Sequence, residues 1–87
     1  KEASFFAERS DISEELVRLR SHVQQFQEIL TKGGGEAPGR RLEFLTQEMV
    51  REVNTMGAKA NDVEISHHVV EMKTLVERIR EMVQNVE

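Results

Sequence analysis

The sequence contains no cysteine, no tryptophan and no tyrosine, and only one proline among its 87 residues. Without cysteine the chain has no disulfide, no thiolate nucleophile and no cysteine-based zinc site. This absence fits a reducing compartment, so we expect a cytoplasmic protein. Hydrophobic runs are short as well. No stretch approaches the roughly 20 apolar residues of a transmembrane helix, and no signal-peptide pattern opens the chain, so we expect no membrane partner.

An excess of basic residues is also missing. Twelve Lys and Arg residues stand against sixteen Asp and Glu residues, which gives a net charge of −4. Only residues 40–60 carry a net positive charge, with four basic and three acidic residues. Proteins that bind nucleic acid usually present a basic face. Charge therefore disfavours RNA or DNA as a partner of this chain by itself.

The sequence is rich in charged residues and in apolar residues at helical spacing. Asp11 with Glu14 resembles a capping box, and Ser10 is a competing N-cap, so the first helix is expected at about 11–32. Gly33-Gly34-Gly35 ends this helix and reads as a linker, because no strand precedes it as in a phosphate-binding loop. The apolar residues of this first helix alternate between spacings of four and three residues, which is a heptad seam: Ile12, Leu16, Leu19, Val23, Phe26 and Leu30.

Two more helices follow. Pro38 lies just before a second helix, expected at about 40–57, and Asn61-Asp62 is a candidate N-cap for a third helix at about 62–86. The two apolar faces are out of phase, so we expect a break between residues 57 and 62. The second face is Leu42, Leu45, Met49, Val53 and Met56; the third is Ile65, Val69, Met72, Val76, Ile79, Val83 and Val86.

These patterns predict an all-α fold: residues 1–87 form a single helical domain, an antiparallel helical hairpin or small three-helix bundle with coiled-coil-like seams. The first and third helices have the longest seams, and we expect them to lie along each other. Such long helices bury modest area, so stability is expected to need a partner chain or another domain. Phe44, Val63 and Val70 fall outside the seams. They are candidates for such contacts and are equally compatible with ordinary surface apolar residues.

The stretch QEMVREVNTMG, Gln47–Gly57, places Glu48 and Glu52 four residues apart on one helix. Side chains at i and i+4 are neighbours, and two carboxylates can converge on a hard cation such as Mg²⁺ or Mn²⁺. The simpler interpretation is a pair of solvated glutamates on the wet side of an amphipathic helix. Periodicity does not decide between the two.

Glu64-x-x-His67 has the spacing found in di-metal carboxylate bundles, but such sites need two motifs of this kind and the chain has one. His67 and His68 fit surface or interfacial histidines better. Arg40 and Arg41, at the start of the second helix, are candidates to bind phosphate and are equally compatible with a solubilising role.

Longer motifs add a resemblance. The segment Gly39–Glu87 contains QEMVREVNT and ends in IREMVQNVE, and it resembles the C-terminal signature of the YicC/YloC family. The preceding segment RSDISEELVRLRSHVQQFQEIL, Arg9–Leu30, is similar to the helix that leads into that signature. The resemblance covers most of the chain, and the combination of motifs is specific.

This resemblance implies a bacterial protein linked to stress responses, with endoribonuclease activity, a divalent metal (Mg²⁺ or Mn²⁺) and ring-like homo-oligomers. Family members are roughly three times as long as this chain, as suits a multi-domain protein. The chain would then be a C-terminal domain without its N-terminal portion. The rival interpretation is a helical oligomerisation or interaction module, with catalysis located elsewhere in the whole protein.

Residue roles follow from the same resemblance. Glu48 and Glu52 would be catalytic and, with Glu71, would hold the metal. RNA phosphates would be oriented by Arg40, Arg41, Arg51, Lys59 and Lys73. His67 and His68 stand where the family has other residue types, so a catalytic histidine is not expected at either position.

Overall fold

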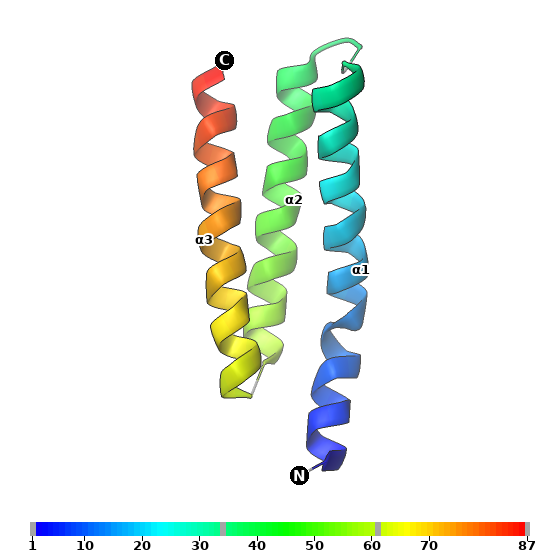
Figure 1. Ribbon diagram of the computed structural model, residues 1–87, viewed down its shortest axis with the longest axis vertical. Coiled ribbons are helices and arrows are strands. Elements are labelled where there is room, and N and C mark those ends of the chain that lie inside the picture. Colours follow the sequence, from blue (N-terminus) through cyan, green and yellow to red (C-terminus); the bar gives the residue numbers. More distant parts are fainter. Residues whose placement is uncertain (1, 34, 61, 87) are drawn as a thin grey trace.

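The computed structural model describes residues 2–33, 35–60 and 62–86, with side chains for 12–33, 35–60 and 62–85. Over those ranges the chain forms three α-helices and no strand: α1 (Glu2–Lys32), α2 (Pro38–Lys59) and α3 (Val63–Val86). They run antiparallel to their neighbours along a rod of 49 × 19 × 16 Å (Figure 1). The predicted all-α three-helix bundle is confirmed.

The two connections follow local chemistry. Gly33 and Gly35 have φ values of 84° and 65°, in the left-handed region that glycine adopts without strain. Pro38 occupies the first turn of α2, where its missing N–H costs nothing. Asp62 caps α3, because its Oδ1 accepts hydrogen bonds from the backbone N–H groups of Glu64 (2.8 Å) and Ile65 (3.2 Å).

The capping role of Asp62 is therefore confirmed. The other candidate cap residues, Asn61 and the side chains of Ser10 and Asp11, lie outside the described residues.

Two helix boundaries differ from the sequence-based expectation. α1 begins at Glu2 rather than near residue 11, because the residues before Ser10 include no glycine or proline and favour helix well enough to continue it. α2 continues through Gly57 to Lys59. A β-carbon on Gly57 would lie 3.3 Å from Cγ1 of Val69, so this glycine permits close packing of α2 on α3 and does not end the helix.

The expectation that the first and third helices lie along each other is wrong. In the described part of the chain, no Cα atom of α1 lies within 8 Å of one of α3, whereas α2 packs against both. Figure 1 shows α2 between its two neighbours. The physical reason is that both neighbours pack most closely on α2, whose residues Thr46, Met49 and Met56 are almost fully buried.

The core confirms the predicted faces of α2 and α3, apart from Val86, whose side chain is not described. On α1 the predicted seam is only partly correct, because Leu16, Val23 and Leu30 are exposed. The face of α1 turned inward instead steps through residues 12, 15, 19, 22, 26 and 29. Buried apolar side chains are Ile12, Ile29, Leu42, Leu45, Met49, Val53, Met56, Val69, Val76 and Val83.

The exposure expected for Phe44, Val63 and Val70 is confirmed. No helix in the described ranges combines the length and the apolar character that crossing a bilayer requires.

Two methionines give a matched test of this packing. Met56 is 0% exposed and Met82 is 60% exposed. Met56→Ala removes buried contacts and leaves a cavity, so we expect urea denaturation to show a loss of about 2–5 kcal/mol in unfolding free energy. Met82→Ala should change it by less than about 0.5 kcal/mol. Equal losses for the two variants would contradict the position of α2 at the centre of the bundle.

Candidate metal centre

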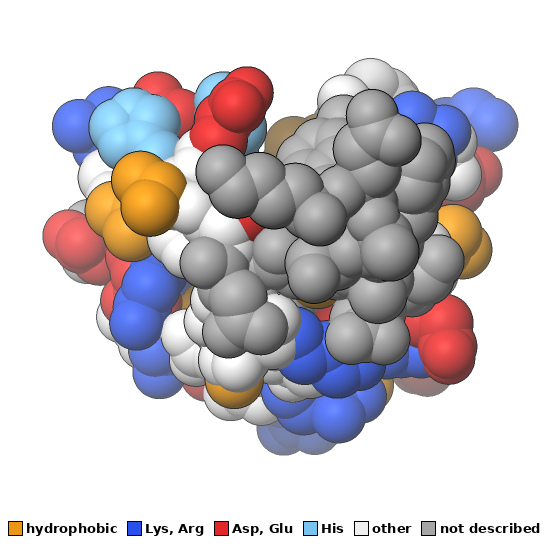
Figure 2. Space-filling view, turned by 90° about the horizontal axis from the view of Figure 1, so that it is seen from below, with side chains coloured by type: hydrophobic (Ala, Val, Ile, Leu, Met, Phe, Trp, Pro, Cys, Tyr) orange, Lys and Arg blue, Asp and Glu red, His pale blue; other side chains and the backbone are white. Residues whose placement is uncertain are grey.

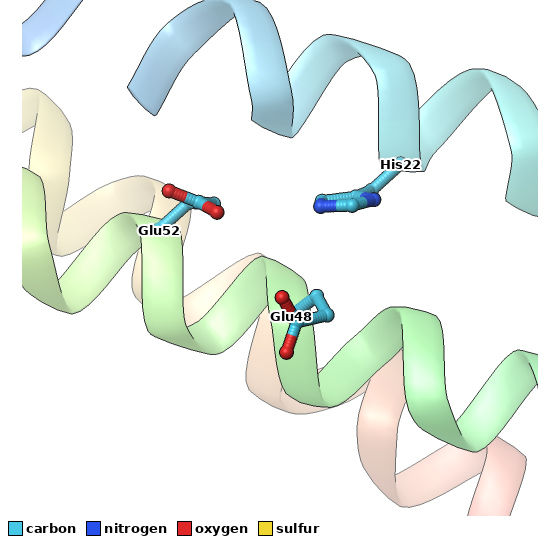
Figure 3. A group of neighbouring side chains, drawn as sticks. All are labelled: His22, Glu48 and Glu52. Atoms are coloured by element: carbon cyan, nitrogen blue, oxygen red, sulfur yellow. The ribbon is translucent and has the colours of Figure 1, made fainter. Parts of the chain in front are cut away.

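Three potential metal ligands meet between α1 and α2. His22 of α1 faces Glu48 and Glu52 of α2, and one donor atom from each residue lies within 4.8 Å of the other two (Figure 3). The two glutamates share a helix face because they are one turn apart. The antiparallel packing of α1 on α2 brings the imidazole opposite them.

Glu52 is held firmly. Its side chain is buried, with the residue 1% exposed in the middle of α2. Its Oε1 accepts a hydrogen bond from Nε of Arg18 at 3.1 Å, which ties α2 to α1. This bond raises the pKa of the Arg18 guanidinium above its already high value. A buried carboxylate needs such a partner, because an unpaired charge in a protein interior is strongly destabilising.

Two buried polar atoms of the centre have no hydrogen-bond partner. They are Nδ1 of His22 and Oε2 of Glu52. Oε2 lies 3.6 Å from a guanidinium nitrogen of Arg51, which is an ion pair and not a hydrogen bond. Buried polar atoms in folded proteins are almost always satisfied. Two of the three residues of this cluster therefore carry an unsatisfied buried atom, and the donor atoms of all three lie close enough to share a cation.

A second cluster lies beside this one. Oε2 of Glu15, a residue only 3% exposed, accepts bonds from Arg18 at 2.9 Å and from Nζ of Lys59 at 3.1 Å. Burial alone would raise the pKa of the Glu15 carboxyl. The hydrogen bond from Lys59 and the charges of Lys59 and Arg18 outweigh burial, so this pKa lies below its ordinary value of 4.5. Arg18 thus connects Glu15 to Glu52.

Arg51 completes the charge pattern. Its Nε lies 3.4 Å from Oε1 of Glu48, and the arginine side chain is 64% exposed. Glu48 is half-buried, so it faces both the centre and solvent. Across the two clusters, the carboxylates of Glu15, Glu48 and Glu52 are matched by three cations: Arg18, Arg51 and Lys59. An ion would therefore compete with Arg51 for the two ligand carboxylates.

The donor set fits some divalent ions better than others. Mg²⁺ prefers oxygen ligands, and an imidazole nitrogen is unusual for it. First-row transition ions accept imidazole and carboxylate together, and Mn²⁺ also keeps the affinity for oxygen that phosphate substrates require. One histidine, two carboxylates and an open side at Glu48 therefore fit Mn²⁺ better than Mg²⁺, as a centre that can also bind water or substrate.

The structure does not bring Glu71 into this group. Its side chain is exposed on α3, where Oε1 lies 3.2 Å from Nδ1 of His68 and 4.0 Å from Nε2 of His67. Figure 2 shows histidine and acidic side chains together at one edge of the lower end of the molecule, and Lys and Arg side chains gathered at the opposite edge. Glu71 and the histidine pair belong to a surface cluster of their own, on the helix that packs against the other flank of α2.

The predicted phosphate-binding residues are dispersed. Arg40 and Arg41 lie in the first turns of α2, and Arg51 lies at the centre itself. Lys59 is paired with Glu15, and Lys73 is exposed on α3. Of these five, Arg51 alone touches the two ligand carboxylates in the structure.

Sequence reasoning missed His22, Arg18 and Glu15. Residues 12, 19 and 26 of α1 lie seven residues apart. A heptad pattern needs a second inward residue after each of them, either three or four positions later. The +4 choice selects Leu16, Val23 and Leu30, and the +3 choice selects Glu15, His22 and Ile29. In the structure the +3 residues face inward. The sequence contains this spacing, but apolar periodicity favours the +4 residues because they are more hydrophobic.

Comparisons with known proteins agree with the resemblance that the sequence motifs carry. The family model described as "Endoribonuclease YicC-like, C-terminal" matches residues 1–87. The chain belongs to this family.

The chain is 44% identical over its whole length to a protein of Clostridioides difficile named "Probable endoribonuclease YicC". It is 45% identical over its whole length to a protein of the same name from Haemophilus influenzae. The match covers 29% and 30% of these two proteins. The chain therefore spans less than a third of the length of the curated relatives it matches.

The pairing of Glu15 predicts a dependence of stability on pH. Between the lowered pKa of the folded state and the ordinary value of 4.5, the unfolded chain binds more protons, so stability rises with pH. The contribution is complete above about pH 4.5 and is lost as the pH falls through the folded pKa. Glu15→Gln should lower the melting temperature at pH 7 and flatten its decline in acid.

Glu28→Gln is the matched control on the same helix, because Glu28 forms an exposed pair with Lys32 at 3.9 Å. Its melting temperature should follow that of the unsubstituted protein from pH 7 to pH 3. A Glu15→Gln protein that melts at the unsubstituted temperature at pH 7 would show that the pairing contributes nothing.

Proposed function

We propose that this domain supplies the metal centre of an RNA-cleaving enzyme, with His22, Glu48 and Glu52 as ligands and Mn²⁺ as the best-fitting ion. The observation that carries the proposal is the meeting of three potential ligands from two helices, two of them with buried atoms that lack hydrogen-bond partners. The two relatives are named probable endoribonucleases. We extend that activity to the whole protein that carries this chain, and we place it in the cytoplasm.

The chain's own residues have distinct tasks in this proposal. Arg18 holds one oxygen of Glu52 through a hydrogen bond, and the other oxygen has no hydrogen-bond partner. Glu48 is half-buried and stands on the side from which substrate approaches. Arg51 is exposed and can move its guanidinium from the carboxylates to a phosphate of the substrate. The chemistry supplied when an ion is bound is polarisation of the scissile phosphate and activation of water or the 2′-hydroxyl.

Phosphate contacts beyond the centre belong to Arg40, Arg41 and Lys73. We assign Lys59 to positioning, because its ammonium is bound to Glu15. The net charge of −4 is unfavourable for a polyanion, so this domain needs basic surface from the rest of the protein to hold RNA tightly. We leave Glu71 out of the ligand set, because its carboxylate contacts His68 on the surface of α3.

A second candidate function is a helical module for self-association or for contact with the rest of the protein. It is favoured by an apolar hollow of about 200 Å³ formed where α1, α2 and α3 meet. Its lining residues are Phe26, Leu30, Leu42, Ile79, Met82 and Val83. In this alternative the carboxylates of Glu48 and Glu52 only pair with Arg51 and Arg18, and the domain binds no ion.

RNA cleavage separates the two functions. In the complete natural protein, Glu48→Gln should reduce Mn²⁺-dependent cleavage of a labelled single-stranded RNA about 100-fold or more, because it removes a ligand of the ion. His22→Gln should act in the same direction. Glu71→Gln is the control of the same chemistry outside the centre and should leave the rate unchanged. Circular dichroism checks that each variant is folded.

Glu48→Gln is preferred over Glu52→Gln because Glu48 is half-buried and its loss leaves the bond from Arg18 to Glu52 intact. Metal-dependent cleavage that persists at the unsubstituted rate in both Glu48→Gln and His22→Gln would refute the metal centre and favour the interaction module. Comparison with the 87-residue domain alone shows whether that domain is sufficient for cleavage.

A further inference from the structure

A small open pocket lies between α1 and the first turns of α2. It is lined by Gln25, Arg40, Arg41, Phe44 and Leu45, and its volume is about 320 Å³. This is the lower end of the range for small-ligand pockets, roughly 300–1,000 Å³. An aromatic ring, two guanidinium groups and an amide therefore share one hollow, which we call the nucleotide pocket.

The nucleotide pocket lies one helical turn from the metal centre on both helices. Phe44 precedes Glu48 by four residues on α2, and Gln25 follows His22 by three residues on α1. Residues at these spacings are neighbours on a helix surface. Figure 3 shows His22 and Glu48 facing each other between these helices.

This separation is longer than the spacing of stacked nucleotides along a strand, so a strand that spans both sites must be partly unstacked. One helical turn rises about 5.4 Å, and stacked nucleotides follow each other at roughly 3.4 Å. A strand with its phosphodiester at the metal centre would place a neighbouring nucleotide at the pocket.

Phe44 provides the flat apolar surface of the pocket. Its residue is 58% exposed, while the adjacent Leu45 is buried in the core. Phe44 therefore contributes little to holding the bundle together. Unpaired bases of RNA stack on aromatic rings in this kind of setting, and such stacking tolerates every base.

Arg40 and Arg41 provide the charge. They occupy the first turns of α2, which has no acidic residue in its first turn. Cations at a helix N-terminus oppose the helix dipole and cost stability, so their presence calls for another role. Together with the positive end of the dipole they create a site that attracts phosphate.

Gln25 provides a polar group that can reach a base edge. Its Nε2 donates a hydrogen bond to Oγ of Ser21 at 3.2 Å, which orients the amide. This bond uses the amide nitrogen, and the amide oxygen has the chemistry of an acceptor for the amino or imino groups of a base.

We propose that the nucleotide pocket binds a nucleotide of single-stranded RNA next to the scissile phosphodiester, with its base on Phe44 and its phosphate at Arg40 and Arg41. This inference rests on the proposed function, because it names the form of RNA that reaches the same centre. In a duplex the bases are already stacked and cannot reach Phe44. The pocket therefore selects unpaired RNA over double-stranded RNA, with little preference for base sequence.

The test is binding without cleavage. The complete natural protein is titrated, in the presence of EDTA, into a fluorescein-labelled single-stranded RNA of about 12 nucleotides, within the usual site sizes of single-strand binders. Fluorescence anisotropy gives the dissociation constant. Phe44→Ala should raise it on the order of 10- to 100-fold, and Phe44→Trp should keep the affinity. Val17→Ala, at another exposed apolar residue, is the control and should bind as the unsubstituted protein does.

Two further readouts separate a stacking role from a structural one. These 87 residues contribute no tryptophan, so the indole signal is taken as the difference from the unsubstituted protein. RNA should quench this signal in Phe44→Trp and should not quench it in Val17→Trp. Arg40→Gln should reduce the dependence of affinity on salt by about one phosphate contact. It should also keep or raise the melting temperature, because it removes a cation from a helix N-terminus.

Three results would overturn the proposal: unchanged affinity in Phe44→Ala, an unquenched indole in Phe44→Trp, or equal competition by double-stranded RNA. These are distinct from failure of the proposed function, which is measured as metal-dependent cleavage in Glu48→Gln. Weakened binding in Phe44→Ala together with normal cleavage in Glu48→Gln would retain the pocket and reject the metal centre.

Discussion

The hydrogen bond from Arg18 to Glu52 is the interaction on which the rest of the site depends. It lies between the two helices that carry the candidate ligands, and it pairs a carboxylate that is almost fully buried. Without Arg18 that charge would be uncompensated in the interior. With it, α1 and α2 adopt the register that puts His22 opposite Glu48 and Glu52. Fold and site therefore share one contact, and a substitution of Arg18 would disturb both.

A polar layer of this kind explains which face of α1 turns toward α2. The inner face of α1 carries Glu15 and His22 between its apolar residues, with Arg18 at its edge. α1 therefore turns that face to α2 and leaves Leu16 and Leu30 exposed. α2 then becomes the central helix, and α3 packs on its other flank. Exposed apolar side chains are the cost of placing ionisable groups where core residues would otherwise lie.

Apolar periodicity predicted what depends on one helix at a time. The faces of α2 and α3, the cap at Asp62 and the proximity of Glu48 to Glu52 all follow from spacing along the chain. What depends on the register between helices could not be predicted. His22 joins the two glutamates only through the packing of α1 on α2, and hydrophobicity selected Val23 at that turn instead. Sequence patterns favour apolar inner faces, so they fail where the inner face contains the functional site.

The central claim is that His22 is a ligand of the same ion as Glu48 and Glu52. The most direct measurement is pulsed electron paramagnetic resonance of the Mn²⁺-loaded protein with ¹⁵N-labelled histidine. The account predicts a nitrogen coupling to the bound Mn²⁺ that disappears in His22→Gln and persists in His67→Gln, since His67 lies on the exposed face of α3. Bound Mn²⁺ without any nitrogen coupling, or a coupling lost in His67→Gln, would contradict it.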